Sequence, residues 1–124
     1  GISVGINIDS GQLKKVGRDR RSFEYEKHPD SGIPFEGMLI PYWSQVVELA
    51  SNIQRYFEFY RLLGMDMAIG AQGPILIEIN SSYDNVDLEQ AIGPILRSPK
   101  VVNNYKEFNL LINQKQVKIA GMYE

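Results

Sequence analysis

Residues 65–80 read Met-Asp-Met-Ala-Ile-Gly-Ala-Gln-Gly-Pro-Ile-Leu-Ile-Glu-Ile-Asn, two apolar runs on either side of a short turn. Apolar runs bounded by glycine are typical of paired strands. The turn at 71–73 predicts a three-residue hairpin loop with Gly73 in the left-handed conformation. With Gln72 at the centre of this loop, Asp66 lies directly opposite Glu78 in an antiparallel hairpin.

The two faces of this hairpin are predicted to differ in character. Because successive side chains of a strand point to opposite faces, Glu78 and Asn80 share a face with Asp66. The other face is expected to be the core face, formed by Met67, Ile69, Ile75, Ile77 and Ile79.

Residues before the hairpin predict strands and one long helix. Residues 2–8 and 23–26 alternate as strands, and residues 14–21 form a basic loop or an irregular strand. A turn is predicted at Asp9-Ser10-Gly11. Apolar spacings of three and four predict a helix over 42–62 that packs on the sheet. Its packed stripe is expected to be Trp43, Val47, Ala50, Ile53 and Phe57.

Residues after the hairpin predict two more helices and a last strand. A short helix is expected over 87–95, and a second from its N-cap at Ser98 to about Leu111. Residues 116–120 are expected to form a strand. The whole pattern indicates one α+β domain over 1–124, with an antiparallel sheet packed against helices.

Composition excludes several classes of protein. The 124 residues are 44% hydrophobic and 23% charged and contain no cysteine, so neither a disulfide nor a thiolate site can form. The 13 basic and 15 acidic side chains give a net charge of -2, which argues against a dedicated nucleic-acid binder. No apolar run approaches the roughly 18–20 residues that span a bilayer. We therefore expect a cytoplasmic protein without membrane insertion.

The acidic pair of the hairpin is the main candidate for chemistry. Like charges directly opposite one another on a sheet face are destabilising. A hard cation such as Mg²⁺ would offset this repulsion, since it prefers carboxylate and amide oxygens. Asp66, Glu78 and Asn80 are thus candidate metal ligands. The alternative is an exposed ribbon face on which water screens the repulsion.

Several short sequence segments resemble motifs of the ATP-grasp superfamily. The segment 64–69, followed by Gly-Pro-Ile-Leu-Ile-Glu-Ile-Asn-Ser at 73–81, is similar to its metal-binding end. Asn-Ile-Asp-Ser-Gly at 7–11, His-Pro-Asp-Ser-Gly at 28–32 and Ile-Pro-Tyr-Trp at 40–43 resemble the sugar-transfer-associated, hexapeptide-transferase-like group of that superfamily. The resemblance spans residues 3–95.

The resemblance implies a function for the acidic pair. Asp66, Glu78 and Asn80 correspond to ligands of Mg²⁺ or Mn²⁺, which bridges ATP phosphates during phosphoryl transfer to a carboxylate. It implies an ADP-forming ligase associated with surface polysaccharide synthesis, with an unidentified carboxylate substrate. Many such ligases carry an arginine two residues before the first metal acid, where this chain has Gly64.

The resemblance also implies that the chain is a C-terminal fragment. The superfamily's N-terminal part, which supplies phosphate-binding lysines and the adenine-binding strand, is absent from this sequence. We expect the fragment alone to be inactive, with self-association of the truncated chain as a further possibility. A non-catalytic nucleotide- or sugar-binding module and a silent structural fragment remain the alternatives.

Three basic side chains are candidates for contacting ATP. Arg18 and Arg21 belong to a basic run that suits phosphate, although a solvated loop would have the same composition. His28 is the single histidine and fits a phosphate contact or a general base, or else the cap of a turn. The aromatic run Tyr56, Phe57, Phe59 and Tyr60 is expected to pack in the core.

Overall fold

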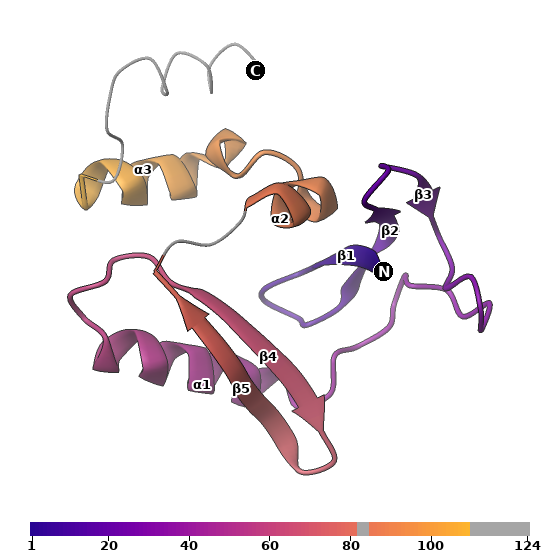
Figure 1. Ribbon diagram of the computed structural model, residues 1–124, viewed down its shortest axis with the longest axis horizontal. Helices are drawn as coiled ribbons and strands as arrows, with labels where there is room; N and C mark the ends of the chain where they lie inside the picture. The colour runs from indigo at the N-terminus through magenta and orange to yellow at the C-terminus, as the bar shows by residue number, and fades with distance from the viewer. Residues whose placement is uncertain (82–84, 110–124) are drawn as a thin grey trace.

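The computed structural model describes residues 1–81 and 85–109, which form two antiparallel sheets and flanking helices (Figure 1). One sheet has the order β1 (Ile2–Ile6), β2 (Leu13–Asp19) and β3 (Glu24–Tyr25). The other is the ribbon of β4 (Gly64–Gly70) and β5 (Gly73–Asn80). The predicted α+β class with antiparallel sheets is confirmed.

The helices lie against these sheets. Helix α1 (Trp43–Tyr56) packs along the ribbon, and α2 (Asn85–Ile92) packs on β1. A 3₁₀ turn, η1 (Ile95–Arg97), leads into α3 (Pro99–Glu107). In the described part of the chain, no helix is long and apolar enough to cross a bilayer.

The first hairpin forms where the sequence predicted it. β1 pairs with β2 around the turn at 7–12, where Asn7 Oδ1 accepts hydrogen bonds from the backbone N–H groups of Asp9 (3.0 Å) and Ser10 (3.3 Å). The basic run, left open as loop or strand, is mostly strand, because residues 13–19 pair with both β1 and β3. The predicted strand at 23–26 shortens to the two residues of β3.

Trp43 joins the first hairpin to α1. Its Nε1–H donates to the Ile8 carbonyl at 2.9 Å, and its side chain lies against the backbone of Gly11. Gly11 is buried at φ 73°, so the site requires glycine both for backbone conformation and for space. The neighbouring Tyr42 hydroxyl donates to the Ala71 carbonyl at 2.8 Å and so ties α1 to the ribbon turn.

The ribbon confirms the predicted pairing of Asp66 with Glu78 but corrects the predicted loop and core face. Gly70 pairs with Gly73, so the loop is the two residues 71–72 and the predicted three-residue loop was wrong. Asp66 pairs with Glu78, whereas beyond this pair Met67 faces Leu76, so that Ile77 is an extra residue on β5. Such a bulge shifts the alternation of the strand that carries it. Ile75 and Ile77 are therefore exposed, at 54% and 65%. Ile69 is exposed as well, at 38%, so the assignment of these three isoleucines to the core was wrong.

Helix α1 is shorter than predicted. It ends at Tyr56, where the Phe57 N–H donates to the Ile53 carbonyl, instead of continuing to residue 62. Beyond this point the chain offers no buried face, since Tyr56 and Phe59 are 82% and 89% exposed, and helices are stabilised chiefly by packing. Val47 and Phe57 of the predicted stripe are exposed as well, so those two positions were wrong.

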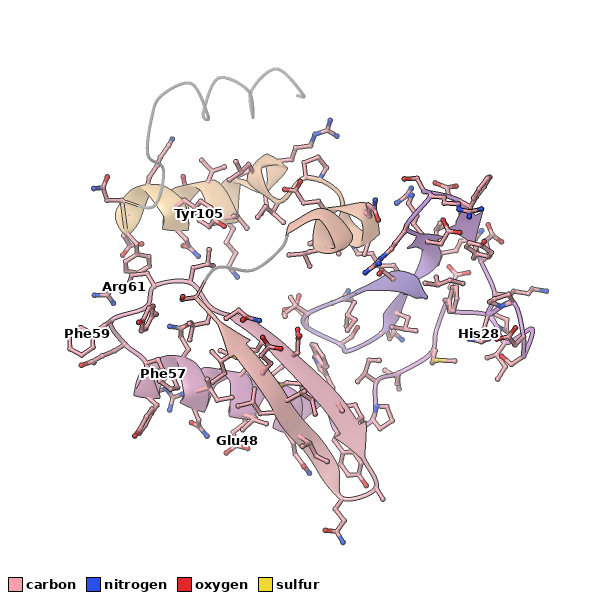
Figure 2. All side chains as sticks on the ribbon, in the orientation of Figure 1. His28, Glu48, Phe57, Phe59, Arg61 and Tyr105 are labelled. Atoms are coloured by element: carbon pink, nitrogen blue, oxygen red, sulfur yellow. The ribbon has the colours of Figure 1, made fainter. Side chains whose placement is uncertain are left out.

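The aromatic run is likewise not part of a core. All four side chains are exposed, and Figure 2 shows Phe59 pointing away from the protein. Tyr56 and Phe57 contact each other edge to face, with ring centroids 5.1 Å apart. Among the described residues, Phe35 is the one large apolar side chain that is buried, at 5% exposure.

The C-terminal helices differ from prediction at their ends. The helix predicted over 87–95 begins at Asn85 and ends at Ile92, because Gly93 adopts φ 86° and breaks it. Helix α3 begins at Pro99 as predicted, but Ser98 makes no side-chain capping bond, and the helix ends at Glu107. The strand predicted at 116–120 lies outside the described residues.

Candidate functional site

Asp66 and Glu78 form a cross-strand pair in the middle of the ribbon. Both are exposed, and Asn80 follows two residues later on β5, paired with Gly64 and half-buried. The predicted opposition of the two acids is therefore present, and the bulge lies immediately beyond them. Alternation along β5 places the Asn80 side chain on the same face as Glu78.

No lysine or arginine in the described chain forms an ion pair with either acid; the ion pairs there join Lys15 to Glu26 and Arg18 to Glu24. Two opposed carboxylates and an amide oxygen are a donor set that suits a hard cation such as Mg²⁺. Among the described residues, no group of three or more histidine, cysteine, aspartate or glutamate side chains lies close enough together to hold a metal ion. Water or substrate oxygens would therefore have to complete the coordination shell, as Mg²⁺ sites at phosphates usually require.

An apolar surface borders the acids. Ile75 and Ile77 are exposed. Because of the bulge, they lie on the same face of the ribbon as Asp66 and Glu78, which is the face away from α1. The opposite face of the ribbon contacts α1. A ligand on the exposed face would therefore meet charged oxygens and aliphatic side chains together.

Arg18 bridges three elements of the structure. Its Nη2 lies 2.5 Å from Glu24 Oε1 on β3, and its Nη1 donates to the Gln90 carbonyl of α2 at 3.2 Å. These contacts give Arg18 a structural role between the first sheet and α2. Its predicted contact with ATP phosphates stays a prediction, and a phosphate would have to compete with Glu24.

Asp19 forms a hydrogen-bonded network at the end of β2. Its Oδ1 accepts the N–H groups of Arg21 (2.9 Å) and Phe23 (3.1 Å), and its Oδ2 accepts the Tyr25 hydroxyl at 3.1 Å. Burial acts to raise the pKa of Asp19, but these hydrogen bonds and the charge of Arg21 outweigh it and hold the pKa below its ordinary value. The bond to Asp19 in turn raises the pKa of Tyr25.

Arg21 and His28 occupy exposed loops beside this network. Arg21 takes part through its backbone N–H, and its side chain is exposed. His28 Nδ1 accepts the backbone N–H groups of Asp30 (3.3 Å) and Ser31 (3.4 Å), so the imidazole caps its own turn (Figure 2). Contact of either residue with a nucleotide stays a prediction.

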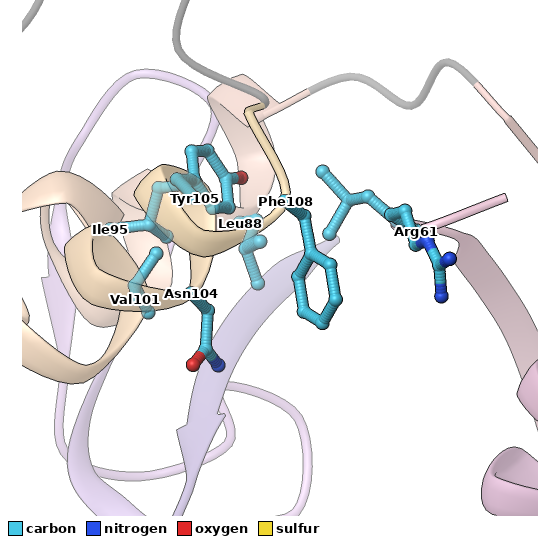
Figure 3. Close-up of a pocket in the computed structure, with 8 residues that line it drawn as sticks. Arg61, Leu88, Ile95, Val101, Asn104, Tyr105 and Phe108 are labelled. Atoms are coloured by element: carbon cyan, nitrogen blue, oxygen red, sulfur yellow. The ribbon is translucent and has the colours of Figure 1, made fainter.

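A separate cavity of about 240 Å³ lies between the loop after α1 and the C-terminal helices (Figure 3). Its lining is largely apolar and includes Leu88, Ile95 and Val101. The Arg61 guanidinium lies over the Phe108 ring, 5.2 Å from its centroid. This cation–π contact engages the cationic group of the cavity, and the lining offers little chemistry for a metal or phosphate.

Sequence reasoning missed the Asp19 network and the isoleucine surface. An aspartate followed by a polar turn, as in Asp19-Arg20-Arg21-Ser22-Phe23, is a usual signal of side-chain to backbone capping and could have indicated the network. The bulge at Ile77 has no local signal in the sequence, because a regular strand and a bulged one share the same residue types.

Comparison with known proteins identifies one family. The family model described as sugar-transfer-associated ATP-grasp matches residues 1–104, which is most of the chain. Searches of curated proteins and of solved structures found no match. The match includes the opposed acids of the ribbon, the His28 loop and α1. The chain therefore belongs to the sugar-transfer-associated ATP-grasp family.

Proposed function

We propose that the chain is the metal-binding part of an ATP- and Mg²⁺-dependent, ligase-like enzyme that activates a carboxylate in a surface-polysaccharide or other sugar-transfer pathway. The observation that carries this proposal is the cross-strand pair of Asp66 and Glu78, without a cationic partner in the described chain and with Asn80 beside it. The family match supports the nucleotide and the ligase-like chemistry.

Each residue of the ribbon has a distinct part in this proposal. Asp66 and Glu78 supply negative oxygens, and Asn80 supplies a neutral one, so the site keeps vacant positions for phosphate oxygens. When bound, Mg²⁺ neutralises the charge of the ATP phosphates and aligns them for transfer. Ile75 and Ile77 provide an apolar surface beside the acids, which suits the planar base or another apolar part of the substrate.

The proposal places only one wall of the nucleotide cleft in residues 1–124. The phosphate-binding lysines and the adenine-binding strand of the superfamily are proposed to lie in a longer parent protein. Preorganised charge is most effective where water is excluded, and an open ribbon face does not exclude water. We therefore expect residues 1–124 alone to bind Mg-ATP weakly and not to turn it over.

The direct test is Mg²⁺-dependent formation of ADP by the full-length protein, compared between wild type and Glu78→Gln. The substitution keeps the shape and one oxygen but removes the charge, so turnover should fall by at least about tenfold, or about 1.4 kcal/mol of transition-state stabilisation. Glu58→Gln, at an exposed position after α1, is the matched control and should leave turnover unchanged.

Two results would contradict the proposal. Unchanged turnover in Glu78→Gln would assign the acids a structural role and favour the alternative of a non-catalytic nucleotide- or sugar-binding module. Gly64, which stands where many of these ligases have an arginine, is the feature that favours that alternative. Tight, Mg²⁺-dependent ATP binding by residues 1–124, measured by calorimetry, would show that the whole nucleotide site lies in this chain.

A further inference from the structure

A second cavity, more polar than the first, lies where the end of β2 meets the loop after β3. Its volume is about 370 Å³, within the range of small-molecule sites. Its lining includes Asp19, Tyr25, His28, Asp30 and Phe35, and we call it the His28 hollow. None of the proposed metal ligands lines this hollow.

Hydrogen bonds already present leave defined polar atoms for a ligand. Both backbone donors of the His28 turn reach Nδ1, so the proton of the neutral imidazole is on Nε2, which can donate. Asp19 Oδ2 accepts the Tyr25 hydroxyl, and a carboxylate oxygen has a second lone pair. The Asp30 carboxylate forms no hydrogen bond or ion pair with the described residues.

The charge of the lining selects against anions. Asp19 and Asp30 line the hollow together with the amino group of Gly1, and no lysine or arginine among the described residues lines it. The bonds that Asp19 accepts from two backbone N–H groups and from Tyr25 hold it in its charged form. A phosphate or carboxylate ligand would therefore meet repulsion, whereas hydroxyl groups can donate to both acids.

Aromatic side chains provide the apolar part of the hollow. Phe35 is 5% exposed and offers a ligand little surface, whereas Tyr25 is half-buried, partly accessible and held in place by its hydrogen bond to Asp19. Amphipathic ligands bind well where an apolar surface is combined with a few placed polar groups. The C–H face of a pyranose ring together with its hydroxyl groups has this character.

We propose that the His28 hollow binds a neutral, hydroxyl-rich ligand, namely a hexose unit. Neighbouring hydroxyls donate to Asp30 and Asp19, another accepts from His28 Nε2–H, and the sugar ring lies against Tyr25. This site is separate from Asp66 and Glu78, so either proposal can fail while the other holds. It also gives His28 a sugar contact in place of the nucleotide contact predicted from the sequence.

The test uses NMR titrations of residues 1–124 with glucose, galactose and N-acetylglucosamine, without ATP or metal. A hexose with a dissociation constant near about 1 mM should shift the signals of His28 and Asp30, whereas glucuronate and inorganic phosphate should not bind. Asp30→Asn should weaken hexose binding about fivefold and admit glucuronate. Glu36→Gln, an exposed carboxylate outside the lining, should change neither result.

Several outcomes would overturn the proposal. These are absence of binding by all three sugars, shifts confined to other residues, and phosphate binding at His28. Tighter binding of glucosamine than of glucose would identify a cation site. Because the Gly1 amino group also borders the hollow, loss of hexose binding on N-terminal acetylation would assign binding to that amine. Unchanged spectra away from the hollow in Asp30→Asn confirm that the variant is folded.

Discussion

Glu78→Gln should stabilise the metal-free protein, because it removes repulsion from Asp66 directly across the ribbon. With the two charges about 5.5 Å apart, as for opposed residues of an antiparallel pair, Coulomb's law in water gives about 0.8 kcal/mol. At 0.15 M salt, with a Debye length of about 8 Å, roughly half of this remains, or about 0.4 kcal/mol. At 1 M salt it falls to about 0.1 kcal/mol.

The assay is urea unfolding followed by circular dichroism in EDTA, at low, physiological and high salt. Glu78→Gln should raise the free energy of unfolding most at low salt, without changing the denaturant dependence. Glu58→Gln is the control, since its carboxylate lies in a turn and not across a strand pair from another acid.

Added Mg²⁺ should reverse the order of the two proteins. Binding to the folded state alone stabilises by about 2.7 kcal/mol at one hundred times the dissociation constant. Wild type should gain this stabilisation and Glu78→Gln much less of it. A variant that is no more stable than wild type at low salt, or that gains equally from Mg²⁺, would refute the reasoning.

Three other substitutions test the rest of the structure. Asp19 has a lowered pKa, so its charged form stabilises the fold at pH values above its ordinary pKa of 3.8. In thermal unfolding, wild type should be more stable than Asp19→Asn by a constant amount near neutral pH, and this difference in stability should shrink as the pH falls below 3.8. Trp43→Phe removes the 2.9 Å bond to Ile8 and should lower the urea unfolding free energy by about 1 kcal/mol or more, whereas a change under a few tenths would contradict the docking of the first hairpin on α1. Arg18→Lys should speed hydrogen exchange in α2, because the bond to the Gln90 carbonyl is lost, and equal exchange would remove its structural role.

The hairpin and its acids could be predicted from the sequence because local signals agree there. Glycine at 73, with φ 130°, marks the turn that the sequence predicted. The loop is one residue shorter than predicted, and the bulge at Ile77 offsets this difference, so that Asp66 still pairs with Glu78. The first hairpin follows for the same reason, from the Asn7 turn. These features depend on residues close in sequence, whose conformational preferences are strong.

The sequence-based predictions that proved wrong share a physical cause, because the burial of a side chain depends on the whole molecule. Apolar residues at helical spacing predicted a helix to residue 62, yet the side chains from Tyr56 to Tyr60 are exposed and the helix ends at Tyr56. Ile75 and Ile77 alternate like core residues, and only the bulge places them on the exposed face. Contacts such as that of Trp43 with Gly11 join distant segments, which no local pattern reports.

The most direct test of the central claim is paramagnetic broadening by Mn²⁺, which takes the place of Mg²⁺ at oxygen sites. In amide NMR spectra of residues 1–124, substoichiometric Mn²⁺ should broaden the signals of Asp66, Glu78 and Asn80 first, and excess Mg²⁺ should restore them. Broadening that begins elsewhere, or that persists unchanged in the Asp66→Asn and Glu78→Gln double variant, would contradict a metal site on the ribbon.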